Sequence, residues 1–157
     1  MPTRRLRRPS EVERVMPVPP ERVFAVLADG WLYAAWVVGA SRIRAVDQHW
    51  PAAGSRIHHS VGVWPLLLDD HTEVVEALPP RRLVLRPRAR PLGAALVELE
   101  LFPAAAGTRV VLREFPTNGP AVLAAPLALA LVPPRNREAL RRLEYLAIRP
   151  VVPRTAR

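Results

Sequence analysis

Polar and apolar side chains alternate through most of the middle of this chain, from about Ser41 to Phe115. Alternation with a period of two is typical of β-strands with one buried face, because successive side chains point to opposite sides of a sheet. Breaks rich in proline and glycine divide the region into six segments of strand length. The predicted strands are Ser41 to Asp47, Ser55 to Val63, Asp70 to Ala77, Arg82 to Arg88, Ala94 to Leu101 and Thr108 to Phe115.

A strand and two short helical segments precede this region. Glu11 to Val15 predicts the first strand, and Pro20 then suits the first turn of a helix, where its missing N–H costs nothing. That helix ends at Asp29-Gly30, since glycine commonly follows the last helical residue. Trp31 to Trp36 predicts a second short helix or turn with inward aromatic side chains. Together the two segments form a helix-loop-helix brace.

The last part of the chain returns to helical spacing. Gly119 to Val132 is apolar on every side, and the stretch from Arg135 onward has the periodicity of an amphipathic helix. Proline inside a helix removes a hydrogen bond and clashes with the preceding turn. We therefore expect Pro126 to kink this segment, and Pro133-Pro134 to interrupt it or begin a new helical segment.

These elements predict an α+β fold, in which a seven-stranded antiparallel sheet curves around a long C-terminal helix, with two short helices after the first strand. The apolar face of such a sheet must be covered, and the C-terminal helix is the element that covers it. A sheet curved around a helix leaves room between them, and such room usually holds a ligand. At 157 residues the chain predicts one domain, residues 10–148, between basic tails at 1–9 and 149–157.

Charge changes this picture little. All 23 basic residues are arginine, and the formal net charge is +9. Seven of these arginines lie in the two tails, which leaves sixteen arginines against fourteen acidic residues in the domain. A nearly neutral domain without a basic stripe argues against nucleic acid as a partner. The absence of cysteine excludes disulfides, thiol nucleophiles and thiolate metal sites.

The chain shows no signal for export or for membrane insertion. Its N-terminus lacks the apolar stretch of a signal peptide. The apolar run Ala121 to Val132 is too short to cross a bilayer. We therefore expect a cytoplasmic protein without a transmembrane segment.

Two polar residues fall on the apolar face of the predicted sheet. His59 shares that face with the apolar residues of Ser55 to Val63, and Glu114 shares it with Val110 and Leu112 on the last strand. A buried imidazole or carboxylate is costly unless it has a partner, so each needs a structural or functional reason. We expect Val110 and Leu112 to be apolar ligand contacts beside these two polar groups.

Two further segments contribute candidate polar contacts. Glu73 and Glu76 are three residues apart on one strand and so point to opposite faces, unless a bulge resets the register. Without a bulge one of them faces inward, and we select Glu73 as a candidate. On the last helix Asn136 precedes Leu140 on the apolar stripe and is a candidate as well.

His59 has two interpretations, which the sequence leaves open. With Glu114 or Glu73 it forms an acid–base pair, in which burial raises the pKa of the carboxyl group and the carboxylate favours a charged imidazole. Such a pair moves protons in a cyclisation or dehydration. Alternatively, His59 is a hydrogen-bonded core histidine and Glu114 lies at a wet strand end. The candidate catalytic residues are His59, Glu114 and Glu73.

Histidine spacing does not predict a metal site. His58 and His59 are neighbours on a strand and point to opposite faces, so both cannot easily ligate one ion. His49 and His71 stand at no recognised ligand spacing. The sequence also has no nucleotide-binding loop. We expect neither a metal nor a cofactor.

The tryptophans lie before the early strands or at their ends. Aromatic side chains in such places either line a pocket mouth and stack on a flat ligand, or plug the end of a core. Both interpretations stay open here. Trp36 and Trp64 are the candidate ligand contacts among them.

In several segments the chain resembles the START-like superfamily, also called the Bet v 1-like or SRPBCC group, from about Glu11 to Ala147. It is most similar to bacterial members described as polyketide cyclase/dehydrase or lipid-transport proteins. The resemblance rests on Val18-Pro19-Pro20-Glu21-Arg22-Val23-Phe24-Ala25-Val26-Leu27, Trp36, Gly54-Ser55-Arg56-Ile57, Pro79-Pro80-Arg81-Arg82-Leu83-Val84-Leu85, Gly107-Thr108-Arg109-Val110-Val111-Leu112 and Arg135-Asn136-Arg137-Glu138-Ala139-Leu140-Arg141-Arg142-Leu143.

The resemblance implies a helix-grip fold with a deep apolar cavity between the sheet and the last helix. Its members bind lipids, polyketides, hormones or other hydrophobic molecules, and a minority are enzymes. We therefore expect a binder of a small hydrophobic or aromatic molecule. One alternative is an enzyme of cyclase or dehydratase type that uses His59 and an inward glutamate. A second is an interaction module whose apolar segment Ala121 to Val132 meets a partner or a second copy, as in a homodimer.

Overall fold

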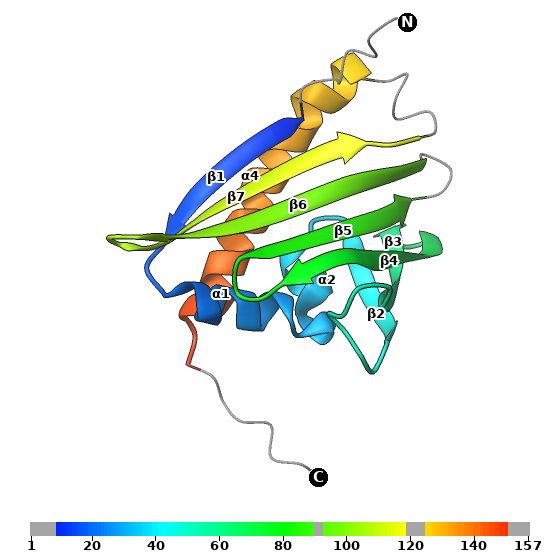
Figure 1. Cartoon of the computed structure of the whole chain (residues 1–157). Coiled ribbons are helices and arrows are strands. Elements are labelled where there is room, and N and C mark those ends of the chain that lie inside the picture. The colour runs from blue at the N-terminus through cyan, green and yellow to red at the C-terminus, as the bar shows by residue number, and fades with distance from the viewer. Residues whose placement is uncertain (1–8, 90–92, 119–124, 151–157) are drawn as a thin grey trace, which may run out of the picture.

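The centre of the protein is one antiparallel sheet of seven strands, in the order β1-β7-β6-β5-β4-β3-β2 (Figure 1). The computed structural model describes residues 9–89, 93–118 and 125–150. The seven strands predicted from the sequence are confirmed, and consecutive strands from β2 to β7 pair as hairpins. Their bounds are β1 Ser10–Met16, β2 Ala40–Val46, β3 Arg56–Val63, β4 Leu66–Leu78, β5 Arg82–Ala89, β6 Gly93–Ala104 and β7 Gly107–Pro116.

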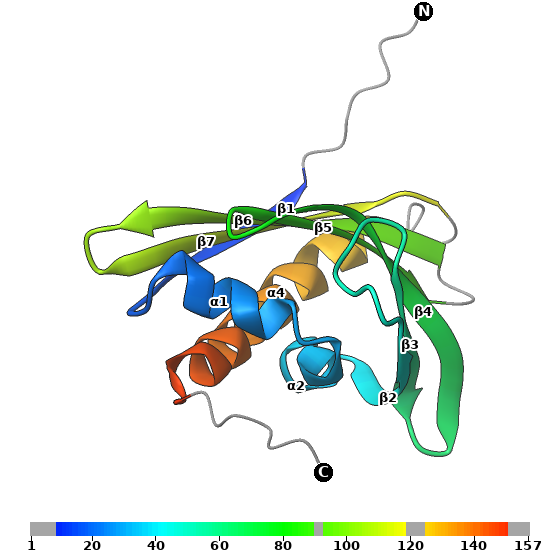
Figure 2. The ribbon, with the colours of Figure 1, turned by 60° about the horizontal axis from the view of Figure 1, so that its bottom comes forward.

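The helices of the described residues lie on one side of this sheet, which curls around them (Figure 2). The predicted brace is present as α1 (Pro20–Leu27), the 3-10 turn η1 (Gly30–Leu32) and α2 (Tyr33–Trp36). The long helix α4 (Ala125–Ile148) runs across the inner face and contacts β1, β7, α1 and α2. This arrangement confirms the α+β helix-grip fold.

The prediction for the last helix was wrong. We expected Pro133-Pro134 to interrupt the segment or begin a new helical one, but α4 is one helix with Pro133 and Pro134 inside it. The kink expected at Pro126 stays a prediction. Pro126 is the second residue of the helix, where no N–H partner is needed. The two inner prolines remove hydrogen bonds, yet their fixed φ is compatible with a helix. Contacts with the sheet and the brace hold the remaining turns in place.

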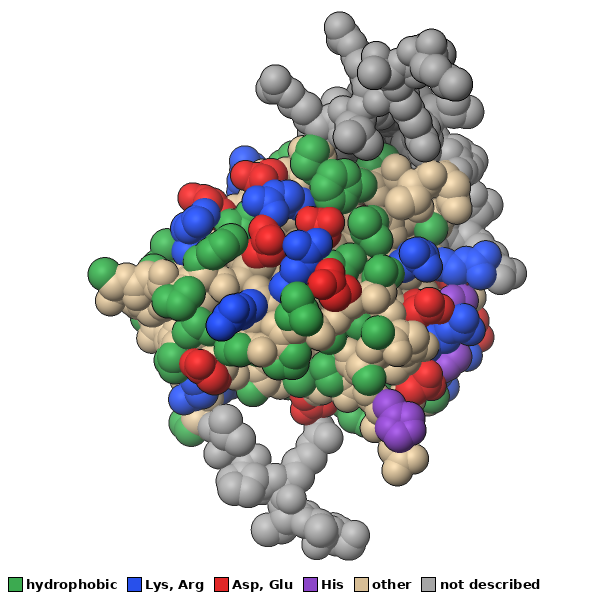
Figure 3. Space-filling model, viewed as in Figure 1, with side chains coloured by type: hydrophobic (Ala, Val, Ile, Leu, Met, Phe, Trp, Pro, Cys, Tyr) green, Lys and Arg blue, Asp and Glu red, His purple; other side chains and the backbone are tan. Residues whose placement is uncertain are grey.

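On the outer face of the sheet, arginine and glutamate side chains lie next to one another among hydrophobic ones (Figure 3). Arg82 lies 3.5 Å from Glu98 and 3.5 Å from Glu100, and Arg113 forms ion pairs with Glu100 and, at 2.6 Å, with Glu11. Arginines from β5 and β7 therefore flank the glutamates of β6, as the alternation of the sequence predicts. Such cross-strand pairs stabilise a sheet by a few tenths of a kcal/mol each, roughly 0.2–1.

A bulge in β4 decides where its two glutamates point. The ladder between β4 and β5 shifts register between Val74 and Glu76. Both Glu73 and Glu76 therefore lie on the outer face, where Glu73 pairs with Arg56 at 2.9 Å and Glu76 pairs with Arg82 at 3.3 Å. The candidate role of Glu73 at an inner site is thus contradicted, because Glu73 alternates with the inward Thr72 and Val74. The extra residue after Val74 moves Glu76 to the outer face as well.

The hairpin that joins β3 to β4 extends beyond the predicted strands. β4 begins at Leu66, four residues before the predicted Asp70, and Trp64 lies in the two-residue turn. Trp64 and Leu66 are each 81% exposed. The structure therefore places Trp64 at a projecting hairpin tip, away from the inner face of the sheet.

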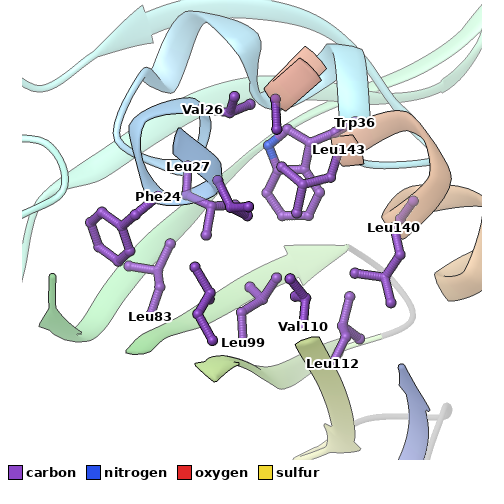
Figure 4. Close-up of a cluster of buried hydrophobic side chains, with 14 of the residues drawn as sticks. Phe24, Val26, Leu27, Trp36, Leu83, Leu99, Val110, Leu112, Leu140 and Leu143 are labelled. Atoms are coloured by element: carbon purple, nitrogen blue, oxygen red, sulfur yellow. The ribbon is translucent and has the colours of Figure 1, made fainter. Parts of the chain in front are cut away.

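The hydrophobic core lies between the sheet, the brace and the C-terminal half of α4 (Figure 4). Burial of each large side chain in such a core stabilises the fold by about 1.5–3 kcal/mol. Val110 and Leu112 are core residues, with 0% and 2% of their surface exposed. The core side chains labelled in the figure are Phe24, Val26, Leu27, Trp36, Leu83, Leu99, Val110, Leu112, Leu140 and Leu143.

Candidate ligand-binding site

His59 occupies the inner face of the sheet, as the alternation predicts. It is 2% exposed and stands opposite Asp70 in the ladder between β3 and β4. Residues directly opposite in an antiparallel pair share a face, so Asp70 also points inward, and its side chain is 2% exposed. Two residues further along β4, Thr72 shares this face and is 0% exposed. The strand pair therefore places three polar side chains inside an apolar surface.

A continuous chain of hydrogen bonds links His59 to the brace. The imidazole Nε2 of His59 lies 2.9 Å from the hydroxyl of Thr72, and the hydroxyl of Tyr33 lies 2.8 Å from the same oxygen. The rings of Tyr33 and His59 also stack, with centroids 5.4 Å apart. Trp36 meets Tyr33 edge to face at 5.6 Å. Helix α2 thus holds its aromatic residues against the imidazole.

The second ring nitrogen of His59 takes no part in these hydrogen bonds. The Nδ1 atom of His59 has no hydrogen-bond partner among the residues that the structure describes. Buried polar atoms in proteins are nearly always bonded, and an unbonded one costs about 1–3 kcal/mol. An unpartnered nitrogen in so buried a place needs a structural or functional explanation.

Burial keeps the side chains of His59 and Tyr33 uncharged near neutral pH. Burial lowers the pKa of His59 to about 4, and the Asp70 carboxylate opposes this effect only in part. Burial likewise raises the pKa of Tyr33 to about 12, against the effect of its hydrogen bond with Thr72. The expected charged imidazole is therefore not found, because desolvation outweighs the neighbouring carboxylate.

A second polar cluster joins β7 to α4. Asn136 is 4% exposed, and its side-chain Nδ2 donates to the Glu114 carboxylate at 2.9 Å. Arg135 forms an ion pair with the same carboxylate and donates to the side-chain Oδ1 of Asn136 at 3.2 Å. The sequence pattern selected Glu114 and Asn136 separately, and the structure brings them together. These bonds provide partners for the side chains of Asn136 and Glu114 at the point where the apolar stripe of α4 begins.

The two clusters act on each other through charge. The carboxylate of Glu114 is among the groups that raise the pKa of Tyr33, while Arg135 lowers it. Between them the apolar face becomes more open along β6: Leu99 is fully buried, whereas the inward Val97, which pairs with Glu114, is half-buried. Partly accessible apolar surface therefore adjoins the Glu114 cluster.

The remaining candidates lie elsewhere. Trp36 is 3% exposed and belongs to the core, where it also supports Tyr33. Val110 and Leu112 are core residues, Glu73 is on the outer face, and Trp64 is at the hairpin tip. The apolar segment expected to meet a partner, Ala121 to Val132, lies largely outside the residues whose side chains the structure describes. The homodimer therefore stays a prediction.

Sequence reasoning missed Tyr33, Thr72 and Asp70. Thr72 and Asp70 follow the alternation of β4 that puts Val74 inside, so this pattern was present in the sequence. Tyr33 lies in the segment Trp31 to Trp36, whose aromatic side chains were expected to point inward, but nothing in a four-residue helix indicated its hydrogen bond with the sheet. Its role depends on the angle at which the brace meets the sheet.

A helix-grip domain with buried polar groups on an apolar inner face defines a protein of the START-like class. Within that class, the chain belongs to the family described as polyketide cyclase / dehydrase and lipid transport, which matches residues 9–147. No curated protein matches the sequence.

Solved structures with the same fold cover most of the chain. A protein of Rhodobacter sphaeroides is 25% identical with a TM-score of 0.69, over 88% of this chain and 91% of that one. A protein of Mesorhizobium loti is 24% identical with a TM-score of 0.65, over 88% and 96%. The di-domain ARO/CYC StfQ from the steffimycin biosynthetic pathway is 12% identical with a TM-score of 0.71, over 88% of this chain and 50% of that one. The last two likenesses show the fold alone.

The described residues contain neither a cluster of metal ligands nor a membrane-spanning helix. In residues 9–89, 93–118 and 125–150, no three His, Cys, Asp or Glu side chains gather closely enough to hold a metal ion. None of the helices within these ranges is both long and apolar enough to cross a membrane.

Proposed function

We propose that this protein binds a small hydrophobic or aromatic molecule, of lipid or polyketide-like type, on the inner face of the sheet beside α4. The observation that carries the proposal is the unpartnered Nδ1 of His59, which is buried in an apolar surface while Nε2 is already bonded to Thr72. A ligand that supplied a partner to Nδ1 would remove the cost of burying that atom.

The surroundings of His59 support a ligand of low polarity. Ligand sites for such molecules are mostly apolar, with a few fixed polar groups that orient the ligand. Here Tyr33 and Thr72 fix the imidazole, and Asn136 with Glu114 forms a second polar point. The family to which the chain belongs includes lipid transport, which is consistent with this proposal.

The test is native mass spectrometry of the purified protein, followed by solvent extraction and by challenge with a library of hydrophobic compounds. We expect a bound molecule that is released on denaturation. Val97→Trp should abolish its uptake, since Val97 faces inward and is only half-buried, so a larger side chain fills ligand space. Val15→Trp is the matched control, because Val15 is 50% exposed and should tolerate the ring.

Two results would contradict the proposal. The first is a wild-type protein that carries no ligand and takes up none from the library. The second is equal uptake by Val97→Trp and the wild type, with both folded by circular dichroism, which would place the ligand away from β6. Loss of uptake in the Val15→Trp control would show that the effect is not specific to the inner face.

A second candidate function is catalysis of the cyclase or dehydratase type. The specific observation is that His59 is neutral and buried with one unpartnered nitrogen, so it can hydrogen-bond a bound molecule and stabilise charge that develops on it. Glu114 replaces Glu73 as the inward carboxylate in this hypothesis. Once a ligand is known, His59→Gln should remove its turnover and keep its binding. Unchanged turnover in that variant would exclude a catalytic role for His59.

A further inference from the structure

The hydrogen-bond chain on the inner face has a preferred direction. Its members are the hydroxyl of Tyr33, the hydroxyl of Thr72 and the imidazole of His59, joined by contacts of 2.8 and 2.9 Å. Within the described part of the protein, none of these three polar groups makes another side-chain hydrogen bond. The possible arrangements of the three hydrogens on these groups can therefore be enumerated.

The arrangement depends on which nitrogen of the neutral imidazole carries its hydrogen. With the hydrogen on Nδ1, Tyr33 donates to Thr72 and Thr72 donates to Nε2 of His59, so both hydroxyl hydrogens are bonded. With the hydrogen on Nε2, the imidazole donates to Thr72, and only one further contact remains for two hydroxyl hydrogens. One of them is then left without an acceptor among the described residues, in a place where Thr72 is 0% and Tyr33 is 4% exposed.

Each arrangement leaves one buried hydrogen unbonded: the Nδ1–H in the first and a hydroxyl hydrogen in the second. In the second arrangement the lone pair of Nδ1 is unbonded as well. The first arrangement leaves fewer buried polar atoms without a partner, so it is the more stable one. It makes the unpartnered Nδ1 of His59 a hydrogen-bond donor. The matching group on a ligand is an acceptor, and in an apolar molecule the usual acceptor is a carbonyl oxygen. An alcohol or a phenol would offer its own hydrogen to a nitrogen that already carries one.

Nearby charge selects against an anion. Asp70 stands opposite His59 in the β-ladder, and its carboxylate acts electrostatically on the imidazole. Glu114 also acts on Tyr33, although its ion-pair partner Arg135 opposes this effect. Like charges repel strongly in a buried place, so a fatty-acid carboxylate is a poor match for this position.

We propose that the Nδ1–H of His59 donates a hydrogen bond to the carbonyl oxygen of a neutral apolar ligand, such as a ketone, a quinone or an ester. This inference rests on the proposed binding function and names the ligand class. Thr72 is a positioning residue, which fixes the hydrogen of His59 on Nδ1.

The first test needs no ligand. In 15N NMR of the imidazole, a nitrogen that carries hydrogen and one that does not have well-separated chemical shifts, and His59→Gln assigns the signals. We expect the hydrogen of His59 on Nδ1. Tyr33→Phe should keep it there, because Thr72 still donates to Nε2, whereas Thr72→Val should lose the preference. A hydrogen on Nε2 in the wild type, or the same result in both variants, would overturn the inference.

The second test compares two fluorescent probes that differ in one group, 6-propionyl-2-(dimethylamino)naphthalene and its 6-propyl counterpart without the carbonyl. We expect the wild type to bind the ketone at least about ten-fold more tightly, as befits one buried hydrogen bond. His59→Phe keeps an aromatic ring but has no N–H, so it should bind the two probes about equally.

The outcomes separate this inference from the proposed function. Binding of both probes with equal affinity by the wild type would overturn the carbonyl preference and leave hydrophobic binding intact. Binding of neither probe would overturn the carbonyl ligand class and also count against the binding function. A ketone preference that persists in His59→Phe would assign the carbonyl contact to another residue and overturn the role of His59.

Discussion

Thr72 and His59 bond diagonally across β3 and β4, at 2.9 Å, although the ladder pairs Thr72 with Ile57 and His59 with Asp70. Diagonal neighbours on one face are close enough for such a contact. The diagonal leaves the hydroxyl of Thr72 free to meet Tyr33 as well. One threonine therefore connects the sheet to helix α2, and the same bond sets the orientation of the imidazole.

The first prediction concerns the energy of this connection. Thr72→Val removes the hydroxyl at nearly constant shape and leaves two buried polar groups, Tyr33 and His59, without their shared partner. We expect the free energy of unfolding to fall by about 1–3 kcal/mol, measured by urea denaturation. Thr117→Val is the control: its exposed hydroxyl bonds the Ala94 carbonyl at 3.0 Å, and its loss should change stability by about 0.5 kcal/mol or less. Equal effects of the two variants would contradict a special role for Thr72.

The second prediction concerns pH. Burial holds the pKa of folded His59 at about 4, below its ordinary value of 6.5, so the unfolded chain binds more protons between these values. The stability that the neutral imidazole contributes is therefore present above pH 6.5 and is lost as the pH falls toward 4. The pKa of His71 is also lowered by burial, which acts in the same direction. The loss attributable to His59 should reach about 3 kcal/mol at most, since one pKa unit corresponds to about 1.4 kcal/mol.

Denaturation at several pH values between 4 and 7 measures this slope. His59→Gln should flatten it, whereas the exposed His49→Gln should leave it unchanged. A slope that is the same in His59→Gln and in the wild type would assign the acid sensitivity to other groups.

The third prediction concerns Gly107, which turns the chain between β6 and β7 with a φ of +136°. A Cβ atom here would lie 2.1 Å from the Met16 carbonyl oxygen and 2.7 Å from the Val18 nitrogen, in the link between β1 and α1. Gly107→Ala should therefore destabilise the protein by at least about 3 kcal/mol.

Gly54→Ala provides the comparison for this substitution. Gly54 also has a positive φ, +86°, but no atom lies within 4 Å of its would-be Cβ. Backbone strain alone should cost about 1–2 kcal/mol there. Thermal denaturation of the two variants measures the difference, and a Gly107→Ala protein as stable as Gly54→Ala would show that the link to α1 can yield.

The fourth prediction concerns the prolines inside α4. Proline in a helix interior costs about 3 kcal/mol relative to alanine, although it also reduces the entropy of the unfolded chain by up to about 1 kcal/mol. Pro134→Ala should therefore raise the free energy of unfolding by about 2 kcal/mol. Pro20 begins α1, where proline is well accommodated, so Pro20→Ala should change stability by about 1 kcal/mol or less. A fall in stability with Pro134→Ala would mean that the packing of α4 depends on the proline ring.

The bulge of β4 shows where sequence patterns stop being sufficient. The spacing of Glu73 and Glu76 indicated that one of them faces inward unless the register shifts, and it does shift, after Val74. A bulge depends on how the neighbouring strands twist, which a single strand does not encode. The same pattern correctly placed His59 and Glu114 on the inner face, because no irregularity occurs between them and their neighbours in β3–β4 and β6–β7.

The sequence by itself determined the seven strands, the brace, the amphipathic part of the final helix after Arg135 and the face on which His59, Glu114 and Asn136 lie, because periodicity is a local property. The continuity of that helix through Pro133 and Pro134 was decided by the tertiary structure. The partners of His59, Glu114 and Asn136 were likewise decided only by the tertiary structure. Tyr33 meets Thr72 across 39 positions and Asn136 meets Glu114 across 22, and these distances close only when the brace and α4 pack on the curved sheet. Hydrogen bonds between distant segments depend on the angles of packed elements, which no local pattern contains.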